Sequence, residues 1–150
     1  MIGEMRDLET ISTALTAAET GHLVFATLHT NNAAQTIDRI IDSFPSSAQG
    51  QVKTQLASTL LGVASQRLIS RVEGGRIPAM EIMFSNTAVR NLIRQGKSHQ
   101  IDLVIETNAN KGMVPLNRSL AGLVKQGEIS LENAQLYSLD PGELRVLLGK

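Results

Sequence analysis

Two polar side chains near the start of the chain, Glu4 and His29, have the types and spacing to act beside a nucleotide phosphate. Glu4 directly follows Met1-Ile2-Gly3, which read as the last residues of a strand, and His29 ends the apolar run HLVFATLH. Ligands of open α/β sheets bind at the carboxyl ends of the strands, so we expect both side chains at one sheet edge. A carboxylate there holds Mg²⁺, often through water, beside a phosphate. The alternative for Glu4 is a solvated acid at a strand end.

The imidazole of His29 could hydrogen-bond a phosphate or orient a water, with the hydroxyls of Thr27 and Thr30 nearby. The alternative is a ring that backbone groups satisfy at the start of a loop. His22 stands at the opposite end of the same run, where a structural or interface role is expected from its position. A zinc site is not favoured, because histidines seven residues apart on a strand fall on opposite faces or ends and no third ligand is in view.

A second group of candidate residues lies on one face of a predicted helix. The segment AVRNLIRQGK repeats a basic side chain at i, i+4 and i+7, which are Arg90, Arg94 and Lys97. Three apolar side chains fall on the other side: Val89, Leu92 and Ile93. The same pattern is typical of a solvated helix face. The sequence contains no glycine-rich phosphate loop and no G-x-S-x-G nucleophile elbow.

The composition limits the class of protein. The chain has 150 residues, 42% of them hydrophobic and 19% charged, which suits one globular domain with a small appendage. The formal net charge is zero, so no nucleic-acid partner is expected. The lack of cysteine excludes disulfides, thiol catalysis and cysteine-ligated zinc. No apolar run approaches the roughly 18 residues of a membrane span, and no signal-peptide pattern occurs, so the expected location is the cytosol.

Hydrophobic spacing and turn residues predict the elements that must position these side chains. A helix begins after Asp7, which can cap it, and stops at Gly21. The run His22 to His29 is short and apolar, as expected for a strand buried on both faces. The polar turn Thr30-Asn31-Asn32 can cap a second helix, which ends at Pro45. A longer helix is predicted from about Ser47 to Leu68.

The second half of the chain is predicted to begin with a hairpin and to continue as helices. Two strands, Leu68 to Val72 and Pro78 to Phe84, flank the turn Glu73-Gly74-Gly75. The predicted helices that follow span 87–95, 98–107, 115–126, 130–137 and a last one opened by Pro141. A boundary between an α/β part and an all-helical part is therefore predicted near residues 84 to 86.

Three segments, in this order, resemble the PilT-type twitching-motility ATPases of the type II/IV secretion ATPase superfamily. Gly3 to Thr10 is similar to the Walker B segment of that family, and Ala17 to Asn31 looks like its His box. Ala88 to Lys97 resembles the motif AIRNLIRE, which distinguishes the retraction branch. Val89 stands where that motif has Ile, and Gln95 stands where it has Glu. The resemblance runs through nearly the whole chain.

The resemblance implies a fold and a function. The fold would be α/β, a partial RecA-like P-loop ATPase core at 1–85 followed by a small all-helical C-terminal region at 86–150. The chain would be part of a hexameric ATPase motor, a homo-oligomer that powers type IV pilus retraction with ATP and Mg²⁺. Its partner would be an inner-membrane pilus platform protein. The motor would be cytoplasmic, peripheral to the inner membrane at the pilus base.

The family's functional residues carry over onto matching positions. Glu4 would be the catalytic Walker B acid, and it would hold the Mg²⁺ ion through water. His22 and His29 would be the His-box pair that binds the cofactor together with Thr27, with His29 catalytic and nearer the γ-phosphate. The motif coupled to motion would consist of Arg90, Asn91, Leu92, Ile93 and Arg94.

Two other classes of protein remain open. One is a related ATPase of pilus assembly or type II secretion. Such relatives often carry a tetracysteine zinc insertion, so the lack of cysteine favours the retraction branch. The other is a non-enzymatic fragment that makes contacts alone. An in-frame GxxxxGK[ST] motif in the DNA upstream of the Met1 codon would favour a fragment of a full ATPase.

We expect the 150-residue chain by itself to have negligible ATPase activity and weak or no ATP binding. A P-loop supplies backbone N–H groups and a lysine to the β- and γ-phosphates, and this sequence contains no such loop. In the resembling family the Walker A loop, the Asp box and a PAS-like domain all precede the position of Glu4. Without them, Glu4 and His29 have no anchored nucleotide to act on. Calorimetry that measures ATP binding with micromolar affinity would contradict this expectation.

Overall fold

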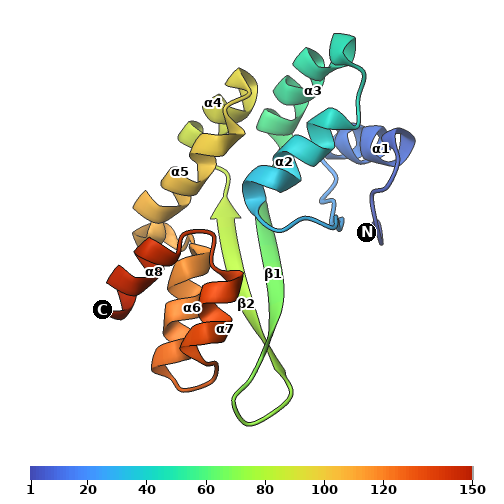
Figure 1. The fold of residues 1–150 in the computed structure, drawn as a ribbon. Coiled ribbons are helices and arrows are strands. Elements are labelled where there is room, and N and C mark those ends of the chain that lie inside the picture. The colour runs from blue at the N-terminus through green and yellow to red at the C-terminus, as the bar shows by residue number, and fades with distance from the viewer. Residues whose placement is uncertain (150) are drawn as a thin grey trace.

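A computed structural model describes residues 1–149 and shows helices arranged around a two-stranded hairpin (Figure 1). The first helices are α1 (Leu8–Glu19), α2 (Ala33–Asp42) and α3 (Ser46–Thr59). The antiparallel strands β1 (Gly62–Ser70) and β2 (Arg76–Phe84) follow. The later helices are α4 (Thr87–Gln95), α5 (Ile101–Thr107), α6 (Leu116–Lys125), α7 (Leu131–Tyr137) and α8 (Pro141–Leu148), with short 3-10 turns at Ser98–Gln100 and Ala109–Lys111. The predicted α/β class with a helical region after the hairpin is confirmed.

Side-chain caps begin several helices where the sequence predicts them. Asp7 accepts the N–H of Thr10 at 2.9 Å, and Asn32 accepts the N–H of Gln35 at 2.8 Å. Asn86 caps α4 in the same way. Each cap satisfies an N–H group that the first turn of a helix leaves without a partner. The predicted starts of α1, α2 and α4 are therefore confirmed.

The predicted helix from Ser47 to Leu68 is wrong after Thr59. Helix α3 ends at Thr59, and Leu60 already has an extended backbone with φ −62° and ψ 124°. The following residues form β1, which pairs with β2 in a register that places Val63 opposite Met83. Residues whose apolar spacing suits a helix therefore form a strand here. Pairing with β2 gives their backbone the hydrogen bonds that a helix would make within itself. The hairpin is correct in kind, but its first strand begins at Gly62 instead of residue 68.

The predicted buried strand from His22 to His29 is also wrong as stated. The segment is extended but makes a single parallel bridge, between Ile2 and Ala26. Backbone hydrogen bonds hold this segment, and one of them runs from the N–H of Ile2 to the carbonyl of Phe25 at 2.8 Å. Leu23 and Phe25 are 67% and 63% exposed. Within residues 1–149 this segment has no ladder of strand pairing beyond that single bridge, so its apolar side chains are not buried on both faces.

Two clusters of buried side chains form the core, and the hairpin contributes to both. The first cluster joins α1 through α5 and contains Ile37 and Met83. The second lies between the hairpin and α6 to α8 and contains Ile69, Ala79 and Leu120. In Figure 1 the hairpin accordingly runs from the upper group of helices down beside the lower one. The division of the chain into 1–85 and 86–150 stays a prediction.

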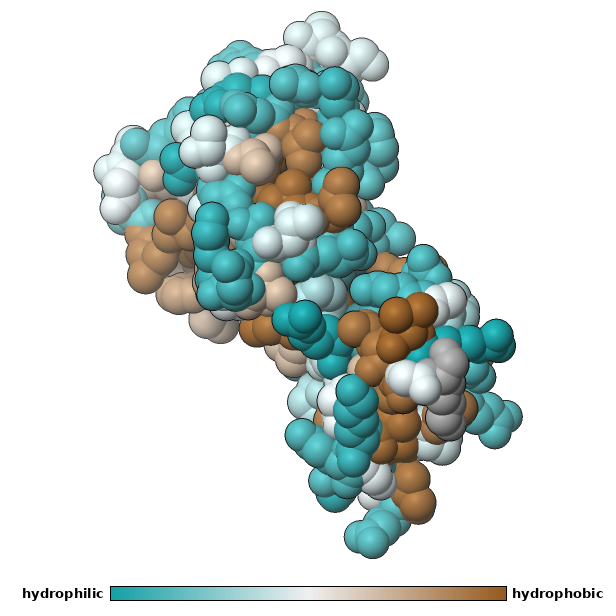
Figure 2. Space-filling model, turned by 90° about the vertical axis from the view of Figure 1, so that its left-hand side faces the viewer, coloured by the Kyte–Doolittle hydropathy of each residue, from teal (hydrophilic) through white to brown (hydrophobic). Residues whose placement is uncertain are grey.

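Apolar side chains also remain on the surface. Figure 2 shows the side of the molecule that carries α4, α5 and α8, where hydrophobic residues gather in separate patches. Leu103 of α5 and Val146 of α8 are 63% and 76% exposed. Of the helices within residues 1–149, none is long and apolar enough to cross a membrane.

The pH dependence of folding stability is expected to reflect Asp102, in the first turn of α5. Burial raises the pKa of its carboxyl, and Oδ1 has no hydrogen-bond partner among the described residues. An acid with a raised folded-state pKa stabilises the fold below its unfolded pKa, and this contribution is lost as pH rises through the folded pKa. We therefore expect Asp102→Asn to improve the free energy of unfolding, relative to the parent, more near neutral pH than in acid. Urea unfolding at the two pH values measures this, and an equal difference at both would contradict it.

Candidate functional site

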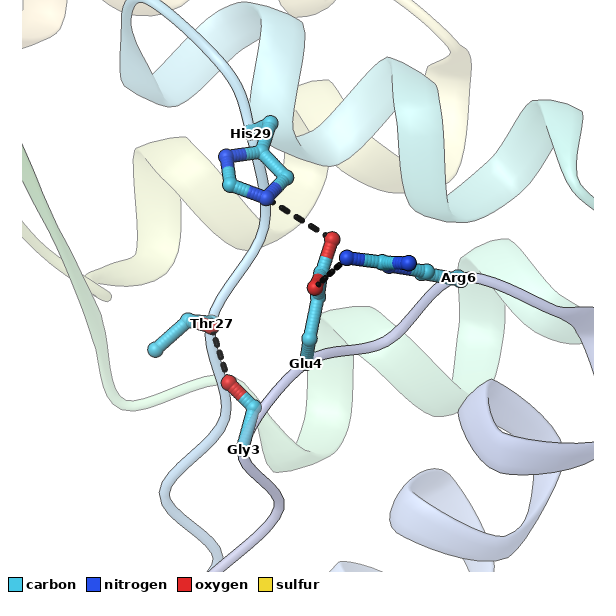
Figure 3. A network of polar contacts seen from close by, with 5 residues as sticks. All are labelled: Gly3, Glu4, Arg6, Thr27 and His29. Atoms are coloured by element: carbon cyan, nitrogen blue, oxygen red, sulfur yellow. Dashed lines mark hydrogen bonds and ion pairs between the residues drawn. The ribbon is translucent and has the colours of Figure 1, made fainter.

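The carboxylate of Glu4 is the centre of the candidate site, and it contacts two basic side chains (Figure 3). Oε1 of Glu4 lies 2.8 Å from Nε2 of His29, and Oε2 lies 2.6 Å from Nη2 of Arg6. The Glu4 side chain is 24% exposed, whereas those of Arg6 and His29 are 75% and 78% exposed. The structure therefore brings Glu4 and His29 together, as their positions in the sequence predict.

Backbone pairing explains why these side chains meet. The N–H of Met5 donates to the carbonyl of Thr27 at 3.0 Å, which places the two extended segments side by side. The hydroxyl of Thr27 donates to the carbonyl of Gly3, directly before Glu4. Side chains two residues apart on an extended chain lie on the same side. The pairing therefore aligns the side that carries Glu4 with the side that carries His29, and Thr27 fixes the backbone between them.

The contacts of Glu4 favour its ionised form. The hydrogen bond from Arg6 lowers the pKa of the Glu4 carboxyl, partial burial opposes this, and His29 acts in the same direction as Arg6. In return, Glu4 raises the pKa of the Arg6 guanidinium. At neutral pH the site thus offers a carboxylate flanked by a guanidinium and an imidazole.

A hollow of about 440 Å³ opens to solvent beside this group. Arg6, His29 and Thr30 line it on one side, and α2 contributes Asp38 and Arg39. Guanidinium, imidazole and hydroxyl groups are suitable donors to phosphate oxygens. Asp38 and Asp42 of α2 also line the hollow, so the donors suited to an anionic group are those beside Arg6 and His29.

The residues present fit a magnesium ion that is held mainly by other ligands. Within residues 1–149 no three histidine, cysteine, aspartate or glutamate side chains come together as a metal site. Mg²⁺ usually keeps several waters and takes one or two carboxylates together with phosphate oxygens. Glu4 can supply one such carboxylate, and its contacts with Arg6 and His29 favour holding the ion through water.

His22 does not join this group. Its Nδ1 lies 3.1 Å from Oγ1 of Thr20 and 3.2 Å from the carbonyl oxygen of Ala17, at the C-terminal end of α1. An extended segment of this length places His22 roughly 20 Å from His29. The role of His22 in binding a cofactor stays a prediction.

The basic motif lies on α4, which packs against α3 and α5. Val89 and Ile93 are buried, in agreement with the predicted apolar side of this helix. Nε of Arg90 donates to Oγ of Ser85 at 3.2 Å, and Arg94 is exposed. In the described part of the chain, no hydrogen bond or ion pair joins the motif to Glu4 or His29. The coupling of residues 90 to 94 to motion stays a prediction.

Sequence reasoning assigns no role to Arg6 or Glu81, although both are connected to the site. Arg6 follows Glu4 by two positions, and this spacing alone could have indicated the ion pair. Glu81 accepts a hydrogen bond from Ala33, 48 residues earlier. No local pattern signals such a long-range contact.

Comparisons with known proteins agree on one family. The family model described as type II/IV secretion system protein matches residues 1–75. The chain is 53% identical, over 135 residues, to the type IV pilus retraction ATPase PilT of Pseudomonas aeruginosa, covering 90% of this chain and 39% of the relative. It is 51% identical, over 136 residues, to the twitching motility protein of Neisseria gonorrhoeae, covering 90% of this chain and 36% of the relative.

A solved structure is similar over nearly the same extent. It is the pilus retraction motor PilT with bound ADP, which matches with a TM-score of 0.84 and 51% identity over 96% of this chain and 40% of that one. The chain thus spans about two fifths of the length of these relatives.

Proposed function

We propose that this chain, which belongs to the type II/IV secretion system protein family, is part of a hexameric ATPase motor that powers type IV pilus retraction. The observation that carries the proposal is the contact of Glu4 with His29, in a chain 53% identical to a retraction ATPase. The whole motor needs parts that this sequence does not contain, notably a phosphate-binding loop. The chain would contribute the acid and the imidazole of the site.

Each residue of the site has a proposed task. Glu4 is ionised and holds Mg²⁺ through water, and the ion, when bound, offsets charge on the phosphate oxygens. His29 lies close to both Glu4 and the hollow. It donates a hydrogen bond to the γ-phosphate or orients a water beside it. Thr27 and His22 belong to the cofactor-binding set, Thr27 by fixing the backbone before Glu4. ATP is supported as the cofactor by the ADP in the solved relative.

The remaining parts of the proposal concern motion and assembly. Residues Arg90 to Arg94 couple nucleotide-dependent movement to retraction, and the exposure of Arg94 leaves one cation of this motif accessible. The motor assembles as a homo-hexamer and acts on a pilus platform protein of the inner membrane. It works in the cytoplasm, at the pilus base, and uses no nucleic acid. The division at residues 85 and 86 separates its ATPase core from its helical region.

A chimera tests the proposed function. Residues 1–150 of this chain replace the matching segment of P. aeruginosa PilT, and the product is expressed in a strain that lacks its own PilT. We expect ATP hydrolysis and restored twitching motility, because the inserted segment would supply Glu4, His29 and the α4 motif.

The other outcomes separate the alternatives. ATP hydrolysis without restored twitching would favour an ATPase of pilus assembly or type II secretion. A chimera that assembles like the parent but neither hydrolyses ATP nor restores twitching would favour a contact-making role. PilT with its own segment intact, and PilT with the segment deleted, are the positive and negative controls.

A further inference from the structure

Glu81 is a buried acid in the middle of β2, and the proposed site does not include it. The residue is 4% exposed. Oε1 accepts the backbone N–H of Ala33 at 2.8 Å. Within residues 1–149 no cation lies within ion-pair distance of Glu81. The main polar contact of this carboxylate is thus with a backbone group and not with a charged side chain.

That backbone group is the first N–H of α2. The first turn of a helix leaves its N–H groups without partners in the helix. Asn32 satisfies the N–H of Gln35, whereas Glu81 satisfies that of Ala33, which is fully buried. Water cannot replace Glu81 there, so removal of this acceptor would leave a buried donor unpaired. The start of α2 is therefore fixed by β2.

The start of α2 in turn fixes the loop that carries His29. Thr30 to Asn32 separate His29 from Ala33. The hydroxyls of Thr30 and Thr36 lie 2.7 Å apart, and the N–H of Asn31 donates to Oε1 of Gln35 at 3.2 Å. Both contacts tie the loop to the first turn of the helix. A displacement of that turn would move His29 relative to Glu4.

We propose that Glu81 is a positioning residue, which holds the first turn of α2 through the N–H of Ala33 and so presents His29 to Glu4. The structural part of this inference stands on the contacts alone, and its catalytic consequence rests on the proposed function. Glu81 would act as a hydrogen-bond acceptor of the right length. Its charge would not be required, since burial, the largest influence, raises the pKa of its carboxyl and disfavours the ion.

Three substitutions in the 150-residue chain separate length, acceptor and charge. Glu81→Gln keeps an acceptor at the same reach and removes the charge. Glu81→Asp keeps the charge but shortens the side chain by one methylene. Glu81→Met removes both the acceptor and the charge while it keeps a buried side chain of similar length.

The measurements are made by NMR and do not need ATP. One is the exchange rate of the Ala33 amide, and the other is the nuclear Overhauser effect between the His29 ring and the Glu4 side chain. We expect Glu81→Gln to preserve both. Glu81→Asp and Glu81→Met should speed Ala33 exchange by about tenfold or more and weaken the contact between His29 and Glu4. The Val89 amide, which Asn86 caps at the start of α4, is an internal reference.

A matched control removes a similar contact far along the chain. Glu143, in the first turn of α8, accepts a hydrogen bond from Nδ2 of Asn117 at 2.5 Å, and Asn117 is a buried residue in the first turn of α6. Glu143→Met should lower stability but leave the signals of His29 unchanged. Overall destabilisation would instead affect His29 in both the Glu143 and Glu81 variants, and that result would overturn the proposal.

Two further outcomes also overturn it. If Glu81→Asp preserves the contact between His29 and Glu4 while Glu81→Gln loses it, the charge of Glu81 is what matters. If Ala33 exchanges faster and the contact persists, Glu81 only caps α2. Should Glu81→Met not fold, the Gln and Asp variants still decide between these cases. An inactive chimera would weaken the proposed function but would leave this NMR comparison unchanged.

Discussion

Glu4→Gln in the PilT chimera should lower the rate of ATP hydrolysis by about a hundredfold or more, with ATP binding and assembly retained. The substitution keeps the size of the side chain and removes its charge. The carboxylate contacts Arg6 and His29 at 2.6 and 2.8 Å, and both contacts lower the pKa of the Glu4 carboxyl. A neutral amide would neither hold Mg²⁺ through water nor pair with these groups in the same way. Steady-state hydrolysis at saturating ATP measures the effect.

The control is a second acid on the neighbouring helix. Glu9 lies exposed in the first turn of α1, so Glu9→Gln changes the charge by the same amount without touching the site. It should leave the rate nearly unchanged, because the exposed Glu9 side chain takes no part in the contacts among Glu4, Arg6 and His29. Equal loss of activity in both variants, or full activity in Glu4→Gln, would exclude Glu4 as the catalytic acid.

Ile37→Ala should lower the free energy of unfolding of the chain by roughly 2–5 kcal/mol. Ile37 on α2 is 0% exposed and lies in the first core cluster. Its truncation removes buried methyl groups and leaves a cavity between the helices. Because α2 also fixes the loop of His29, the variant tests how much the site depends on this packing. Urea unfolding, extrapolated linearly to water, gives the value.

Leu136→Ala provides the comparison for this prediction. Leu136 is an apolar residue of α7 that is 77% exposed, so its truncation should change the free energy of unfolding by no more than about 0.5 kcal/mol. If Ile37→Ala were no more destabilising than Leu136→Ala, the packing of α2 onto the first cluster would be wrong.

The helices of this chain could be predicted from the sequence because their starts are local. An aspartate or asparagine cap needs a partner three residues later, and Asp7, Asn32 and Asn86 each have one. The spacing of apolar residues then indicates which side is buried. Information of this kind lies within a few residues, so single-sequence reasoning finds it.

The strands could not be predicted as well, because their limits depend on partners that are distant in sequence. The residues after Thr59 have apolar side chains at helical spacing, yet they pair with β2. The extended segment from His22 to His29 carries Leu23 and Phe25, which an apolar pattern places in a core. Their exposure depends on which strands lie beside them, and a local pattern cannot report that.

The candidate site could be predicted only in part, because some of its contacts follow from strand ends and others from the tertiary fold. Glu4 and His29 each end an extended segment, and the rule for parallel strands brings such ends together. The pairing of Glu4 with Arg6 depends on side-chain conformation, and that of Glu81 with Ala33 on the tertiary fold. Both groups become apparent in the structure because the contacts that define them cross between elements.

The hairpin of β1 and β2 has a consequence for how the molecule comes apart. Its strands supply Met83 to the first cluster and Ile69 and Ala79 to the second, and they pair with each other along their whole length. Loss of either cluster would expose one end of this pair of strands and so weaken the cluster at the other end. The parts of the molecule built around the two clusters should therefore unfold together in one cooperative transition, although Glu4 and His29 lie only in the part built around the first cluster.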